Sequence, residues 1–157
     1  MILSLTIAAC LQLKEPKNIP YIRTIRTVSC KNHVDPRLTM AIIKEESGFH
    51  KYAMMKEKTG DTSRGLMQVE YSTAKSLGLK RKSSWLYSPW LNIFYGTKYL
   101  HKLLIKYDNL DDVISAYNAG RPLLYRHFKY YRRHKYVNYK YVNNVKYLYK
   151  KFVKESN

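Results

Sequence analysis

Two proline-containing helix starts, Asp35-Pro36 and Ser88-Pro89, do most to restrict the fold of this 157-residue chain. The first residue of each pair can cap a helix with its side chain, and proline suits the first helical turn. Apolar residues recur at helical spacing after both pairs, and no segment alternates convincingly as a β-strand does. The sequence therefore predicts a mainly α-helical fold, with at most a short irregular β segment in residues 51–64.

The expected helices follow one another along most of the chain, and the length suits a single domain. Gly48 and Gly120 are placed to end two of these helices, because glycine readily adopts the left-handed conformation found after many helix ends. We expect helices over residues 21–31, 37–47, 72–78, 88–107 and 109–120, and a final helix that includes 137–152.

The first ten residues resemble the apolar core of a secretory signal. Residues 7–10 (Ile-Ala-Ala-Cys) also resemble the lipobox of bacterial lipoproteins, in which Cys10 is lipidated after cleavage. We therefore assign residues 1–20 to a signal or lipobox segment and 21–157 to one domain; the alternative is a buried N-terminal segment. In the first interpretation Cys30 has no partner and is a buried small residue.

Positive charge is the outlying property of the composition. The chain has 29 Lys and Arg against 11 Asp and Glu, which gives a formal net charge of +18. This charge predicts an anionic partner, such as nucleic acid, an acidic membrane surface or an anionic cell-wall polymer. The last helix is basic and rich in tyrosine, and its lysines either form a solvated face or bind a polyanion. Its apolar stripe is formed by Val137, Tyr141, Val145, Leu148 and Phe152.

Glu46 is the residue whose position most suggests chemistry. On a helical wheel it lies opposite Arg37 and Lys44, among apolar side chains. Burial disfavours the charged form of a carboxyl group, so we expect a raised pKa and a neutral acid near pH 7, as a general acid needs. The structural alternative is that Glu46 bonds a neighbouring backbone group or an arginine from elsewhere.

Three motifs come in the order and rough spacing of a known family. They are residues 46–49 (Glu-Ser-Gly-Phe), 65–68 (Gly-Leu-Met-Gln) and 116–120 (Ala-Tyr-Asn-Ala-Gly). Over about residues 34–150 the chain resembles the soluble lytic transglycosylases and goose-type lysozymes, which cut peptidoglycan. This resemblance implies a lysozyme-like helical fold and no cofactor. The five His and two Cys show no zinc-like spacing, so we expect no metal.

The resemblance implies a role for each matching residue. Glu46 corresponds to the catalytic acid, and Tyr117 to the tyrosine whose hydroxyl approaches it. The residues expected to bind substrate are Gln68, Met67, Asn118 and Ser47. Structural alternatives remain open: Met67 as a core residue, Asn118 as a helix cap and Tyr117 as a buried ring with a backbone partner.

The implied reaction cuts the β-1,4 bond between N-acetylmuramic acid and N-acetylglucosamine. Glu46 protonates the glycosidic oxygen and then, as a base, lets the muramic acid 6-hydroxyl close a 1,6-anhydro ring. The alternative is a goose-type lysozyme (muramidase) in which Asp61 or Glu70 positions a water. The structural alternatives are a turn residue for Asp61 and a surface acid paired with Arg64 for Glu70. The serine that transglycosylases often carry in this loop has no clear match in this chain, and Thr59 and Ser63 are the candidates for its place.

Partners and location follow from the same resemblance. We expect peptidoglycan glycan strands and anionic wall polymers as partners, and no obligate nucleic acid. The protein is expected to be a monomer that acts outside the cytoplasm or with a phage particle or secretion machine. A non-catalytic cell-wall-binding or nucleic-acid-binding basic protein is the lesser alternative.

Overall fold

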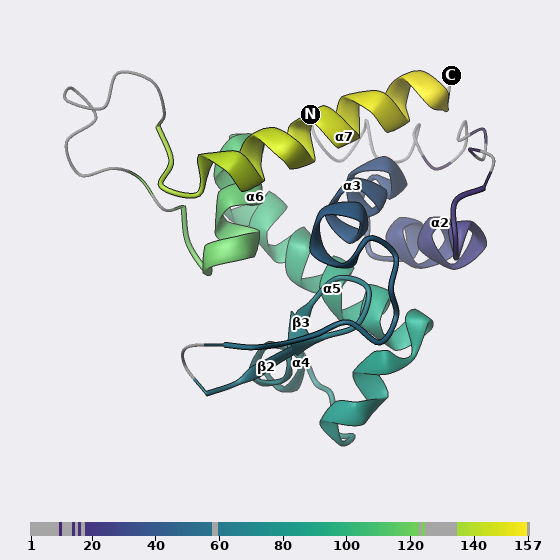
Figure 1. Cartoon of the computed structure of the whole chain (residues 1–157), viewed down its shortest axis with the longest axis vertical. Helices are drawn as coiled ribbons and strands as arrows, with labels where there is room; N and C mark the ends of the chain where they lie inside the picture. The colour runs from purple at the N-terminus through teal and green to yellow at the C-terminus, as the bar shows by residue number, and fades with distance from the viewer. Residues whose placement is uncertain are drawn as a thin grey trace.

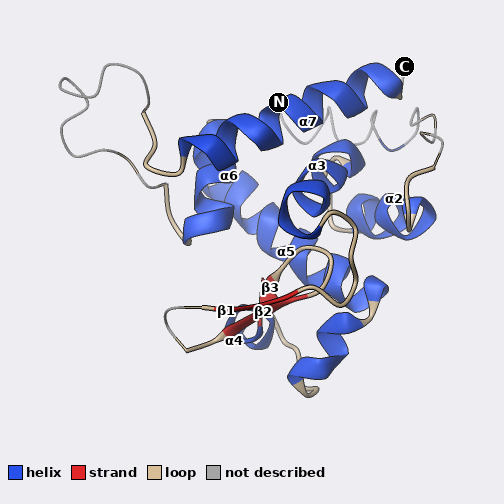
Figure 2. Ribbon diagram, viewed as in Figure 1, coloured by secondary structure: helices blue, strands red, loops and turns tan. Residues whose placement is uncertain are grey.

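In the computed structural model the described residues are 10, 14, 16, 18–57, 60–122, 124 and 135–156. They form a mainly helical fold with one small sheet, as predicted (Figures 1 and 2). The helices are α2 (Ile22–Lys31), α3 (Pro36–Ser47), α4 (Tyr71–Ser76), the 3₁₀ helix η1 (Ser83–Tyr87), α5 (Pro89–Lys106), α6 (Leu110–Ala119) and α7 (Tyr139–Glu155).

Helix α5 runs through the middle of the molecule and packs against α2, α6 and η1 (Figure 1). Helix α7 lies across α3 and α6 and contacts both. The core between these helices is apolar, and each fully buried side chain of this size contributes roughly 1.5–3 kcal/mol. Its fully buried members include Ile25, Ile42, Ile93, Ile114 and Val145.

The start of α3 is fixed by Asp35, as the sequence predicts. Its carboxylate accepts a hydrogen bond from the backbone N–H of Arg37 at 2.8 Å and forms an ion pair with the Arg37 guanidinium. The Tyr149 hydroxyl, on α7, donates to the same carboxylate. The cap therefore also ties α7 to the beginning of α3, while Gly48, with φ 58°, ends the helix.

Three short strands pair antiparallel in the order β1 (Met54–Lys56), β2 (Thr62–Arg64) and β3 (Val69–Glu70). Strands β1 and β2 fall within residues 51–64, where the sequence predicts a short β segment. Strand β3 lies outside that segment and was not predicted. The sheet lies below α3 in the view of Figure 2 and contacts α5 through β3. Residues of all three strands line the same pocket as Glu46 of α3.

One expectation about the N-terminal part of the chain needs correction. Cys30 does have a partner, because it forms a disulfide with Cys10. A sulfur in this bond is not free for lipidation, and the lipobox interpretation of Cys10 stays a prediction. Residues 1–9 lie outside the described residues, and the signal segment stays a prediction. No described helix is long and apolar enough to span a bilayer.

The final helix also differs in detail from its prediction. Val137 precedes α7 and is 45% exposed, so it is not part of the buried stripe. Tyr136, one residue earlier, is buried and donates a hydrogen bond to Asp112 on α6. Lys146 forms an ion pair with Asp111 at 2.7 Å, and Lys151 forms one with Glu155 at 3.8 Å, so both of these lysines already have an acidic partner within the protein.

Candidate functional site

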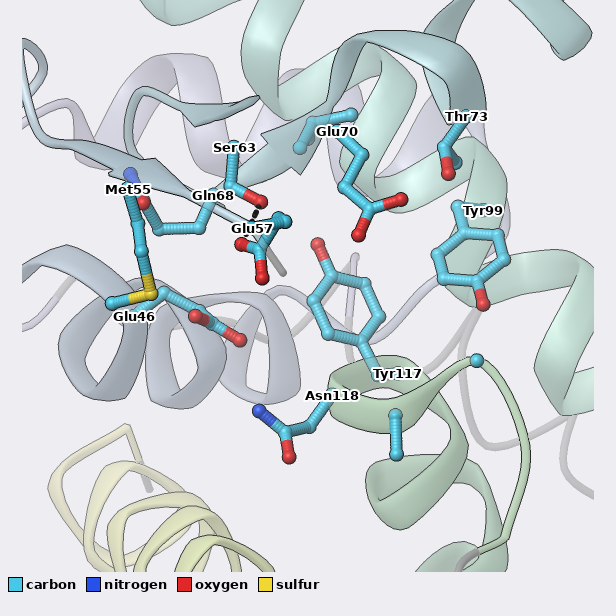
Figure 3. A pocket seen from close by; sticks show the side chains of 13 residues that line it. Glu46, Met55, Glu57, Ser63, Gln68, Glu70, Thr73, Tyr99, Tyr117 and Asn118 are labelled. Carbon is cyan, nitrogen blue, oxygen red and sulfur yellow. Dashed lines mark hydrogen bonds between the residues drawn. The ribbon is translucent and has the colours of Figure 1, made fainter. Parts of the chain in front are cut away.

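A pocket of about 450 Å³ opens between the end of α3, the small sheet and the end of α6 (Figure 3). Three carboxyl groups line it, those of Glu46, Glu57 and Glu70. The other polar side chains at its wall are Ser63, Gln68, Thr73, Tyr99, Tyr117 and Asn118. This is a concave, polar site that is large enough to hold a sugar unit, and six helices and strands (α3, β2, β3, α4, α5 and α6) supply polar groups to it, with Glu57 and Gln68 added from loops.

Glu46 is the acid at the end of α3, and it is half-buried. Burial raises the pKa of its carboxyl group to about 7, and the negative charges of Glu45 and Glu57 act in the same direction. The Tyr141 hydroxyl donates a hydrogen bond to Oε1 of Glu46, which opposes part of this rise. Much of Glu46 is therefore neutral near pH 7, and it can donate a proton.

Tyr141, on α7, is the functional candidate that the sequence analysis missed. We expected the Tyr117 hydroxyl to approach the acid, but it donates to the backbone carbonyl of Met67 at 3.0 Å, although its ring does line the pocket. Tyr141 had been placed in an apolar stripe. A signal was present, because a buried tyrosine hydroxyl usually has a hydrogen-bond partner.

The loop that carries Gln68 is held by a buried side chain of α5. Asn92 accepts from the backbone N–H of Met67 at 2.8 Å and donates to the carbonyls of Arg64 and Leu86 at 2.7 and 2.8 Å. A Cβ at Gly65 would lie 2.3 Å from the Asn92 amide nitrogen, so only glycine fits there. The loop is therefore clamped between the sheet and α5.

Gln68 itself lines the pocket with its backbone in the left-handed region, at φ 44°. Few residues other than glycine adopt this conformation, and they cluster at functional sites. Its side-chain amide donates to the Gly65 carbonyl at 2.8 Å, which leaves the side-chain oxygen of Gln68 as an acceptor. Asn118, at the end of α6, lines the opposite side of the pocket (Figure 3).

Two of the expected substrate-binding residues lie behind the pocket rather than at its wall. Met67 is fully buried and packs against Gly96, where an added Cβ would come within 2.5 Å of its sulfur. Ser47 donates to the Leu66 carbonyl at 2.7 Å. Both residues join the loop to neighbouring helices, and the pocket lining includes neither. The structural alternative for Met67 is thus the one that the geometry supports.

The two candidates for a second carboxylate differ in position. Asp61 accepts from the backbone N–H groups of Thr62 and Ser72 and does not line the pocket. Although burial opposes it, these hydrogen bonds and the charge of Arg64 lower the Asp61 pKa. Its geometry is that of a turn and capping residue. Glu70 does line the pocket, and burial and the charges of Glu57 and Asp61 raise its pKa.

Glu57 is a third pocket carboxylate that the sequence analysis did not consider. It follows β1, and its Oε1 accepts a hydrogen bond from the Ser63 hydroxyl at 2.6 Å (Figure 3). Ser63 is thus the loop serine at the pocket, while Thr59, the other candidate, lies outside the described residues. Glu57 lies in an irregular turn, where periodicity gives no indication of side-chain direction. Among the described residues no cluster suited to a metal ion occurs.

Comparison with known proteins identifies relatives of this chain. The family model "Transglycosylase SLT domain" matches residues 23–140. A transglycosylase of Enterobacteria phage PRD1 is 32% identical over 97 residues, which cover 62% of this chain and 34% of the phage protein. Membrane-bound lytic murein transglycosylase C of Shigella sonnei (strain Ss046) is 36% identical over 123 residues, with 69% of this chain and 33% of that protein covered. The chain thus spans about a third of these relatives.

The fold has a counterpart among solved structures. The inactive E503Q mutant of lytic transglycosylase Slt from Pseudomonas aeruginosa matches with a TM-score of 0.67 and 21% identity. The match covers 88% of this chain and 24% of that one. At this level of identity the likeness concerns the fold, and it confirms the predicted lysozyme-like architecture.

Proposed function

This chain belongs to the transglycosylase SLT domain family, and on that premise we propose that it is a peptidoglycan lytic transglycosylase. Its substrate is the β-1,4 bond between N-acetylmuramic acid and N-acetylglucosamine. The observation that carries the proposal is the carboxyl group of Glu46, which faces a sugar-sized pocket and has a pKa of about 7 because it is buried. An acid of this pKa suits proton donation near neutrality.

The proposed reaction needs one protein carboxyl group. Neutral Glu46 gives its proton to the glycosidic oxygen, and the bond from this oxygen to the anomeric carbon breaks. The Glu46 carboxylate then takes the proton of the muramic acid 6-hydroxyl, whose oxygen bonds to the anomeric carbon. The products are a 1,6-anhydro end and a free 4-hydroxyl, and no water is consumed. The hydroxyl of Tyr141 stabilises the carboxylate that exists between the two proton transfers.

The alternative outcome is hydrolysis, and one observation favours it. Glu57 and Glu70 line the same pocket as Glu46, so a second carboxylate is available to hold a water. Asp61, which hydrogen-bonds backbone groups away from the pocket, is not supported in this role. A muramidase with Glu57 or Glu70 as its second carboxylate is therefore the second candidate function.

The charge of the whole chain fits a protein that works on the cell wall. A net charge of +18 attracts the protein to anionic wall polymers, and we propose that it acts outside the cytoplasm or with a phage particle. Of the three carboxyl groups at the pocket, those that are ionised would repel the phosphates of a nucleic acid, so nucleic acid is a poor occupant of this site. We further propose that the protein acts as a monomer.

Mass spectrometry of the muropeptides released from purified peptidoglycan tests the proposal. We expect 1,6-anhydro ends from the parent protein and no release by Glu46→Gln, which still binds the wall. The matched control is Glu45→Gln, since Glu45 is the neighbouring acid of α3 and bonds Asn144 on the surface. We expect this control to cleave, with the alkaline limb of its activity profile moved to lower pH, because the charge of Glu45 helps to raise the Glu46 pKa. Reducing ends would establish the muramidase route, and undiminished cleavage by Glu46→Gln would remove Glu46 from the mechanism.

A further inference from the structure

Asn138 precedes the first residue of α7, yet its side chain does not cap that helix. It crosses to α6 and hydrogen-bonds there with both ends of its amide. Its Oδ1 accepts from the Ser115 hydroxyl at 2.7 Å. Its Nδ2 donates to the Ser115 carbonyl at 3.1 Å and to Oδ1 of Asn118 at 3.0 Å. An asparagine in a favoured capping position thus makes its bonds to the helix that ends at the pocket.

These bonds determine which way round the Asn138 amide lies. The Ser115 carbonyl belongs to the backbone and can only accept, so it requires the NH₂ end of Asn138. Ser115 is fully buried and its carbonyl is fixed within α6. The second N–H of Asn138 is consequently directed at Asn118, and it requires an oxygen there.

The orientation of the Asn118 amide follows in turn from that of Asn138. Because its Oδ1 accepts from Asn138, its Nδ2 is the end left for the pocket, and Figure 3 shows this nitrogen turned toward Glu46. We propose that Asn138 is a positioning residue that makes Asn118 a hydrogen-bond donor, and not an acceptor, to the sugar beside Glu46. This inference rests on the proposed glycan-cleaving function.

The polarity of Asn118 selects among the groups of a sugar. Hydroxyl groups both donate and accept, so they bind either end of an amide. The carbonyl oxygen of an acetamido group only accepts, and it therefore matches an N–H donor. The ammonium of a de-N-acetylated sugar only donates, and it meets the same N–H unfavourably. Asn138 thus favours N-acetylated over de-N-acetylated glycan at this position.

Asn138→Asp tests the idea, because a carboxylate has no donor for Asn118. Asn118 must then turn its NH₂ group toward residue 138 and its oxygen toward the pocket. We expect the KM for N-acetylated peptidoglycan to rise about tenfold, which corresponds to one hydrogen bond, with a smaller change in kcat. We also expect the preference for N-acetylated over de-N-acetylated glycan to fall. Asn138→Ala, which leaves Asn118 free to turn, should lie between the parent and Asn138→Asp.

An Asn118→Ala background separates positioning from general damage to the fold. If Asn138 acts through Asn118, Asn138→Asp changes neither KM nor the preference in that background. A further loss of the same size there, or an unchanged preference in the single variant, would overturn the inference. Thermal unfolding of each variant identifies any that fail to fold, and Asn138→Ala then supplies the comparison.

Binding measured without turnover keeps this inference distinct from the proposed function. In a Glu46→Gln background, the affinities for N-acetylated and de-N-acetylated glucosamine oligomers should show the same loss of preference on Asn138→Asp. If the parent protein releases no muropeptide but this binding preference changes as expected, the catalytic proposal fails and the assignment of Asn138 stands. If the parent protein releases muropeptides but Asn138→Asp leaves the binding preference unchanged, the catalytic proposal stands and the assignment of Asn138 fails.

Discussion

At the scale of single residues, Glu46 is where stability and chemistry oppose each other. Burial raises its pKa from 4.5 to about 7, so between these values the folded protein holds a proton that the unfolded chain has released. The contribution of Glu46 to the stability of the folded protein is therefore greatest below the pKa that this group has in the unfolded chain, and it declines as the pH rises toward 7. Glu46→Gln removes this loss, and we expect it to stabilise the protein at pH 8 by at most about 3 kcal/mol.

Thermal unfolding at two pH values checks the pH dependence of this effect. At pH 4 the parent carboxyl group is largely neutral in both states, so parent and Glu46→Gln should unfold at similar temperatures. An equal gain at pH 4 and pH 8 would mean that the change acts through packing and not through the charge. The cleavage activity of the parent should decline above pH 7, where Glu46 loses its proton.

Tyr141 should affect both the rate and the pH profile. Its hydrogen bond lowers the Glu46 pKa, so Tyr141→Phe should move the alkaline limb of the activity profile to higher pH. The variant also loses a bond to the carboxylate, and we expect kcat to fall about tenfold. Tyr149→Phe is the matched control, since it lies on the same helix and bonds Asp35. An unchanged pH profile in Tyr141→Phe would contradict the assignment.

The sequence could identify Glu46 and not Tyr141 for a physical reason. The environment of Glu46 depends on its own helix, and helical spacing alone places it among apolar side chains. Tyr141 lies 95 residues further along the chain, and its contact with Glu46 depends on how α7 docks. Glu57 was equally inaccessible, because a turn has no periodicity from which its direction follows.

At the scale of elements, the loop of residues 65–68 depends on Asn92 of α5. Asn92→Ala leaves one backbone N–H and two carbonyls without this partner in the interior. We expect a loss of roughly 2–4 kcal/mol in the free energy of unfolding, measured by urea denaturation. Asn144→Ala, at an exposed asparagine of α7, should change stability by less than about 0.5 kcal/mol. Similar losses in both variants would remove the special role of Asn92.

Helix boundaries show where local signals suffice. Asp35 and Gly48 bound α3 through bonds made within a few residues, and both were predicted. The start of α7 was placed too early, because Val137 has the right spacing from Tyr141 but lies before the helix. Val137 lies outside the helix because its neighbour Tyr136 turns toward α6, where the Tyr136 hydroxyl donates a hydrogen bond to Asp112. Strand β3 is only two residues long and exists because β2 lies beside it.

At the scale of the whole molecule, the disulfide joins α2 to the preceding chain. Cys10 and Cys30 are 20 residues apart, and closing a loop of this size contributes about 3 kcal/mol in chain-entropy models. We expect a reducing agent to lower the melting temperature while cleavage at lower temperature is unchanged, because neither cysteine lines the pocket. A Cys10→Ser/Cys30→Ser double variant should melt low with or without the reducing agent. A parent protein that melts identically when reduced would contradict this prediction.

The docking of α7 on α3 and α6 has a consequence for how activity begins (Figure 1). A ribosome releases the acid, the sheet and the loop of Gln68 long before it releases Tyr141 and Asn138. A nascent chain therefore contains Glu46 before it contains the Tyr141 hydroxyl that hydrogen-bonds this acid and the Asn138 amide that orients Asn118. We therefore expect the site to become active only when α7 has been made and has docked, and a chain truncated before α7 to be inactive.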